Sequence, residues 1–167
     1  MSYALILFGI LMRLIPHAPN FTPVAAIALF GGAILPGWQG MVVPLLLMIG
    51  SDIFLGFHGN VLWVYGSFLL VAWIGRRLGK DATIGWIGFG ALSSSLLFFL
   101  ITNIAVWLAP DGMYPKTFSG LMVCYMMAIP FFRNELLATF LYSITFFGVY
   151  RLAESWLQRR TKETVQV

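Results

Sequence analysis

The sequence predicts an all-α integral membrane protein with about six transmembrane helices in a single bundle. Of the 167 residues, 60% are hydrophobic and only 10% are charged, and the mean hydropathy is +0.89. A soluble domain of this size has too small a core to bury so much apolar surface, so lipid must solvate most of it. The length leaves room for about six spans of roughly 20 residues, and we expect no appended catalytic or nucleotide-binding domain.

Helix breakers and charged residues divide the chain into seven apolar stretches. These stretches cover residues 2–16, 23–36, 39–57, 61–79, 82–108, 118–131 and 134–157. The stretch 118–131 is the weakest of them, because it is short, ends in Ile129-Pro130 and is followed at once by Arg133. We therefore predict six spans and regard 118–131 as the candidate for a short re-entrant or interfacial segment.

Basic residues set the predicted orientation, because cytoplasmic loops near span ends are enriched in Lys and Arg. They form two clusters, namely Arg76, Arg77 and Lys80, and then Arg151, Arg159, Arg160 and Lys162. Both clusters lie on one side if an even number of spans separates them. This predicts a multi-pass protein of the bacterial inner (plasma) membrane with both termini cytoplasmic, a transmembrane domain over 1–158 and a cytoplasmic basic tail over 159–167.

The net charge of +4 is explained by these helix-end and tail residues, so we expect no nucleic-acid partner. The predicted outer loops 16–23, 57–61 and 109–134 carry most of the remaining polar residues. We expect the loop segment 109–117, with Asp111-Gly112, to form a mobile lid.

The string from Arg13 to Pro23 is the most distinctive in the chain. It holds three prolines within eight residues, while Asn20 and Thr22 can cap the helix that follows. A stiff, capped turn would account for these features but needs neither Arg13 nor His17. Ionisable groups at membrane depth are costly unless they are paired or functional. We therefore favour a functional loop over a turn alone.

Asp52 lies near the end of the third apolar stretch. A lone carboxylate at that depth costs several kcal/mol unless it has a cation partner. Arg13 lies at a similar depth if the first and third helices both run outward, so we predict a contact between Arg13 and Asp52. The pair can belong to a binding site or can simply staple two helices together. The sequence favours neither of these readings.

The histidines His17 and His58 lie at the outer ends of different spans and could together ligate a metal. Two ligands without a carboxylate or thiolate companion are too few, and we predict neither a metal nor another cofactor. The single cysteine, Cys124, excludes an internal disulfide. Because no nucleophile and base occur at matched depth, we also predict that the protein is not an enzyme.

The predicted function is capture of a small solute in an outward-facing pocket. Asn103 must find polar partners inside the bundle, and Trp107 offers a stacking surface one turn further on. The residues predicted to bind the solute are Arg13, His17, Asn20, Asp52, His58, Asn103, Trp107, Arg133 and Asn134. The alternative is a non-transporting accessory or structural subunit of a membrane complex.

A family resemblance points the same way. The segment 16–23, the Ala-rich helix with Gly31-Gly32, then Gly40 and Ser51-Asp52 resemble the substrate-binding S components of energy-coupling factor transporters. The string His17-Ala-Pro-Asn-Phe-Thr-Pro23 is closer still to an uncharacterised bacterial membrane family related to them. The resemblance covers mainly residues 13–58, with a looser likeness over 114–135.

The resemblance implies a six-helix fold with cytoplasmic termini and a pocket closed by the first, third and fifth loops. It also implies capture of a vitamin or other micronutrient, and docking onto a transmembrane coupling subunit driven by two ATPases.

Overall fold

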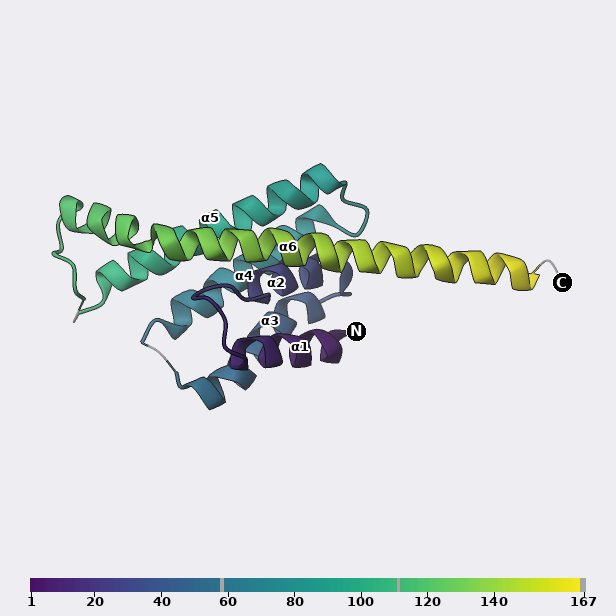
Figure 1. Ribbon diagram of the computed structural model, residues 1–167, viewed down its shortest axis with the longest axis horizontal. Helices are drawn as coiled ribbons and strands as arrows, with labels where there is room; N and C mark the ends of the chain where they lie inside the picture. The colour runs from purple at the N-terminus through teal and green to yellow at the C-terminus, as the bar shows by residue number, and fades with distance from the viewer. Residues whose placement is uncertain (58, 111, 166–167) are drawn as a thin grey trace.

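The structure is a computed structural model that describes residues 1–57, 59–110 and 112–165. Every regular element in these residues is an α-helix, which confirms the predicted all-α class. The helices are α1 Ser2–Leu14, α2 Val24–Ile34, α3 Gln39–Leu55, α4 Val61–Leu78, α5 Ile84–Leu108 and α6 Phe118–Val165 (Figure 1).

Three of these helices are long and apolar enough to cross a membrane, namely α4, α5 and the part of α6 from Phe118 to Thr161. They indicate a membrane location, as the composition predicts. The other three are apolar but shorter, with 13, 11 and 17 residues in α1, α2 and α3. Three helices rather than six therefore meet the length expected of a span.

Helix α2 is the centre of the bundle, and its residues from Val24 to Gly32 are all buried. It contacts every other helix. A Cβ added to Gly32 would collide with the backbone carbonyl of Ala72 in α4, and one added to Gly75 would collide with that of Leu29. The small-residue face of α2 therefore packs inside the bundle, because glycine lets the two backbones touch. Protein rather than lipid surrounds this short helix.

Helix α6 corrects the prediction for 118–131. That stretch and 134–157 belong to one continuous helix, with Pro130 inside it. A proline removes one backbone hydrogen bond and bends a helix without necessarily ending it. Packing of α6 along α5 and α2 accounts for its continuation. The segment 118–131 is thus the first part of α6 and not a re-entrant segment.

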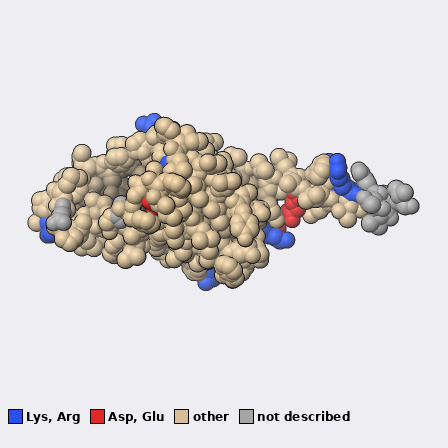
Figure 2. All heavy atoms as spheres, turned by 90° about the horizontal axis from the view of Figure 1, so that it is seen from below, with Lys and Arg blue, Asp and Glu red and all other residues tan. Residues whose placement is uncertain are grey.

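The C-terminal part of α6 projects beyond the bundle (Figure 1). Its 48 residues, at about 1.5 Å each, give a helix of about 72 Å, more than twice the roughly 30 Å of bilayer hydrocarbon. Figure 2 shows charged side chains along this projection, whereas the body in that view is largely uncharged. The helix runs through the predicted boundary at 158 without a break, and 166–167 lie outside the described residues.

The connections gather at two opposite ends of the bundle (Figure 1). Segment 15–23 and the described parts of 56–60 and 109–117 lie at one end, which we call the loop end. The N-terminus lies at the other, where Ser2 Oγ donates to Gln39 Oε1 at 3.1 Å. There Arg76 also donates to the Gly37 carbonyl, and Arg151 to that of Ala82. Residues from both basic clusters thus share the end opposite the loop end.

Candidate functional site

The bundle has a cavity of about 500 Å³ at the end opposite the loop end and several cavities at the loop end, one of them, of about 370 Å³, beside Asn60 and Ala109. Three neighbouring loop-end cavities have volumes of about 370, 300 and 40 Å³, and we call the first of these three the main cavity. Asn20 and Phe98 line all three. Asn20 comes from segment 15–23, where its φ of 61° is a left-handed conformation that asparagine tolerates better than most residues. This turn places the side chain at the junction of the cavities.

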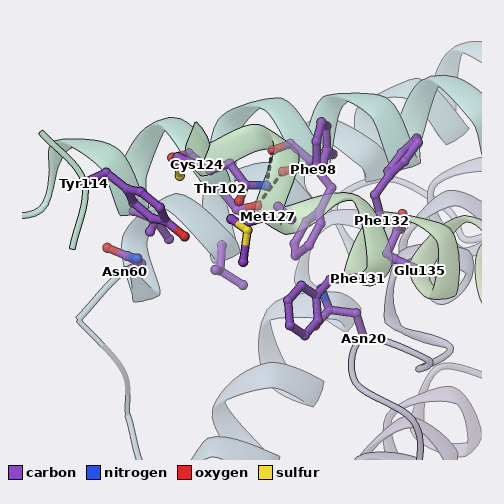
Figure 3. Close-up of a pocket in the computed structure, with 15 residues that line it drawn as sticks. Asn20, Asn60, Phe98, Thr102, Tyr114, Cys124, Met127, Phe131, Phe132 and Glu135 are labelled. Carbon is purple, nitrogen blue, oxygen red and sulfur yellow. Dashed lines mark hydrogen bonds between the residues drawn. The ribbon is translucent and has the colours of Figure 1, made fainter. Parts of the chain in front are cut away.

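The main cavity lies between α4, α5, α6 and the segment before α6 (Figure 3). In that view Glu135 and Asn20 lie toward one end of it, and Tyr114 and Asn60 lie toward the other. Its lining residues are Asn20, Asn60, Val64, Phe98, Phe99, Thr102, Asn103, Val106, Tyr114, Cys124, Met127, Ala128, Phe131, Phe132 and Glu135.

Polar groups in this lining keep free hydrogen-bonding capacity. Asn103 donates through Nδ2 to the Phe99 carbonyl at 2.8 Å, and Thr102 donates to the Phe98 carbonyl at 2.8 Å. Each therefore satisfies one donor within α5 and leaves a side-chain oxygen able to accept. A solute in the cavity would meet these groups against a largely aromatic background.

Glu135 is the most unusual residue of the site. It is 6% exposed, and its Oε1 accepts a hydrogen bond from Thr139 Oγ1 at 2.9 Å. Its Oε2 is buried and makes no hydrogen bond of ordinary geometry within the described chain, although the buried Ser95 hydroxyl lies beside the carboxylate. Glu135 lines both the main and the smallest cavity. A buried carboxylate oxygen without a hydrogen bond is energetically costly, so this position requires an explanation.

Glu135 was not among the residues predicted to bind the solute, because it falls at the outer end of the predicted stretch 134–157, just after the expected break at Pro130. Treating 118–157 as one helix would have identified Glu135 as a buried residue. Cys124, Ala128, Glu135 and Thr139 are all buried and are separated by four, seven and four residues, a spacing that keeps them on one helix face.

The predicted contact between Arg13 and Asp52 is confirmed. Arg13 Nη1 lies 2.7 Å from Asp52 Oδ1, and Asp52 is 1% exposed. Tyr65, which the sequence did not single out, donates to Asp52 Oδ2 at 2.8 Å. Arg13 Nη1 also donates to Ser51 Oγ and lies 3.2 Å from Met48 Sδ. This ion-pair cluster joins α1, α3 and α4.

The structure brings only part of the predicted residue set to the cavities. Arg13, His17 and Asn20 line the 300 Å³ cavity, whereas Asn103 lines the main one. His58 lies outside the described residues. Four predicted residues line none of the three cavities within the described chain, namely Asp52, Trp107, Arg133 and Asn134.

Helix geometry explains why residues next to Glu135 point elsewhere, since successive side chains on a helix are about 100° apart. Arg133 is exposed. Asn134 donates through Nδ2 to the Pro19 carbonyl at 3.0 Å and so ties segment 15–23 to α6. These two residues therefore support or flank the site and do not line it.

Trp107 lies at the end of α5, just before segment 109–117, the predicted lid, and bonds to a residue of that segment. Its Nε1 donates to the Pro115 carbonyl at 2.9 Å, and Lys116 donates to the carbonyls of Trp107 and Ala109. The lid role stays a prediction, and Asp111 lies outside the described residues. Tyr114 is the residue of this segment that lines the main cavity.

The helices and the cavities define a helical membrane protein with a small-molecule-sized cavity at one end of its bundle. The chain belongs to DUF6580, a family of unknown function whose model matches residues 1–162. No curated protein and no solved structure matches it.

Proposed function

We propose that this protein captures a small solute at the loop end as part of a membrane transport system. The observation that carries the proposal is the main cavity of about 370 Å³. Small-molecule sites typically have volumes of about 300 to 1,000 Å³, with apolar walls and a few placed polar groups. Phe98, Phe99, Phe131 and Phe132 supply the walls here.

In this proposal all six helices cross the membrane, and the loop end faces outward. The two-ended arrangement of the connections supports six passes (Figure 1). Because its neighbours bury α2, this short helix can be one of the six that cross the membrane without lying against lipid along its length. The basic residues at the opposite end support cytoplasmic termini, because such residues favour the cytoplasmic side.

The likeness to S components of energy-coupling factor transporters suggests a vitamin or other micronutrient as the solute. It also suggests a transmembrane coupling subunit with ATPases as the partner. Capture at the outer face would then be this chain's task, and energy would come from that partner.

The proposal is tested by identifying small molecules that the purified protein retains. Protein isolated in mild detergent is denatured, and the released molecules are measured by mass spectrometry. Ala128→Phe should lose the molecule, because Ala128 lines the main cavity and a phenyl ring would fill it. Ile129→Phe should retain it, because Ile129 is 56% exposed on the same helix.

Thermal unfolding of Ala128→Phe shows whether this variant remains folded. If a folded Ala128→Phe released as much of the molecule as the unmodified protein, the main cavity would not be the binding site. If the unmodified protein released none, capture would be contradicted.

A non-transporting accessory subunit is the second candidate, and the projecting part of α6 favours it. Leu152, Trp156 and Leu157 are 71%, 52% and 58% exposed there. Such a surface suits a protein partner. This candidate predicts that a larger complex co-purifies with the full chain, is lost when the chain is ended after Arg151, and contains no retained small molecule.

A further inference from the structure

We propose that the solute is a protonated amine whose ammonium group binds Glu135 in the main cavity. This inference rests on the proposed function, since it names the chemical class that the same cavity would take. It begins from a buried carboxylate with one oxygen bonded to Thr139 and the other without a hydrogen bond of ordinary geometry in the described chain.

The protein supplies Glu135 with no cation of its own among the described residues. The one ion pair in that part of the chain joins Arg13 to Asp52. Lys116 bonds the backbone carbonyls of Trp107 and Ala109, and Arg133 is exposed. Arg76 and Arg151 bond carbonyls at the opposite end. When Glu135 is ionised, its counter-ion must therefore come from outside the described chain.

The aromatic wall near Glu135 favours an organic cation. Phe131 and Phe132 lie on α6 about one helical turn before Glu135. The ring centroid of Phe132 lies 4.7 Å from that of Phe99. Phe98 lines all three cavities. Phenyl faces attract an ammonium group electrostatically and also accept the apolar part of a molecule.

Other ligand classes fit less well. An anion would be repelled by an ionised Glu135, and with a neutral solute Glu135 would have to take up a proton to avoid an uncompensated charge. A metal ion needs several ligands, and the described residues hold no group of three or more His, Cys, Asp or Glu side chains that could bind one.

The far end of the main cavity can recognise the rest of the molecule. Asn60 and Tyr114 lie there in Figure 3, with Asn103 also in the lining. Their amide and phenol groups both donate and accept hydrogen bonds. The site therefore fits a solute with an ammonium group at one end, an apolar or aromatic middle and a neutral polar group at the other.

Three probes that share an indole ring test the charge preference. They are tryptamine, which is cationic, tryptophol, which is neutral, and indole-3-propionate, which is anionic. Binding to the purified full chain is measured by ligand-induced thermal stabilisation. We expect tryptamine to bind at least about tenfold more tightly than the other two, as a charge-assisted contact would allow.

Glu135→Gln should abolish this preference and still fold, because glutamine retains an acceptor for the Thr139 hydroxyl. Glu154→Gln is the matched control, since Glu154 is on the same helix but lines none of the three loop-end cavities. This control should leave the preference intact. Equal binding of the three probes, no binding of any of them, or an unchanged preference in Glu135→Gln would overturn the inference.

The molecule released from the unmodified protein separates this inference from the proposed function. A released amine supports both. A released neutral or anionic molecule would overturn the amine assignment and leave capture standing, whereas absence of any released molecule would contradict capture itself.

Discussion

Two buried carboxylates in this protein have very different surroundings. Asp52 has Arg13 as an ion-pair partner on Oδ1, although that oxygen accepts no hydrogen bond of ordinary geometry in the described chain, and its Oδ2 accepts a hydrogen bond from Tyr65. Glu135 is bonded by Thr139 on one oxygen, while the other makes no hydrogen bond of ordinary geometry in the described chain. They are 1% and 6% exposed, so burial does not distinguish them. What distinguishes them is charge compensation: a carboxylate with a cation from its own chain is typical of a structural contact, and a buried carboxylate in a cavity without one is typical of a binding site.

The largest expected effect is on the ion-pair cluster. Arg13→Met removes the cation and leaves Asp52 buried without a counter-charge. We expect the free energy of unfolding to fall by about 3 to 5 kcal/mol. Reversible unfolding in mild detergent measures it. Arg133→Met is the control, because Arg133 is exposed and its loss should change stability by less than about 0.5 kcal/mol.

Removing both charges sharpens this prediction. The double variant Arg13→Met with Asp52→Leu should recover most of the lost stability, because two apolar groups need no pairing. A double variant as unstable as Arg13→Met alone would show that packing around Arg13, and not its charge, is what matters.

Tyr65→Phe should have a smaller effect. It deletes the hydroxyl that donates to Asp52 at 2.8 Å and keeps the ring and the ion pair. The expected loss is about 1.5 kcal/mol, the lower range for a hydrogen bond to a charged group. Tyr3→Phe should show no loss, since Tyr3 is 87% exposed. Equal stability of the two variants would show that the Tyr65 hydroxyl contributes nothing to the stability of the ion-pair cluster.

Asn134→Ala should have the smallest effect on stability, about 1 kcal/mol or less, because it deletes one hydrogen bond at the protein surface. It should also release segment 15–23 from α6 and increase proteolytic cleavage there. The neighbouring Arg133→Ala is the control. Unchanged cleavage of Asn134→Ala would mean that other contacts hold this segment.

The sequence predicted much of the fold because most helices here end at recognisable breakers. The predicted stretches for α1 to α5 end within two residues of the helices. The contact between Arg13 and Asp52 was also predictable, since a carboxylate within an apolar run requires a cation and Arg13 was the one at matching depth.

One error comes from Pro130. Local preference indicated a helix end there, whereas packing against α5 and α2 carries α6 through it. That error placed Glu135 at the outer end of a span and favoured Arg133 as a lining residue. Trp107 is a separate error, because its indole bonds the Pro115 carbonyl and does not line the main cavity. Which helix face points inward depends on contacts between distant segments, and no single stretch of sequence contains that information.

The most direct test of the account compares Asp52→Asn with Glu135→Gln in the absence of added solute. Each change removes one charge and conserves shape. The free energy of unfolding should fall by at least about 2 kcal/mol for Asp52→Asn, because Arg13 loses its counter-charge. It should stay equal or rise for Glu135→Gln, because a buried, half-bonded carboxylate is replaced by a neutral amide. Equal losses in the two variants would contradict the distinction between a structural cluster and a binding site.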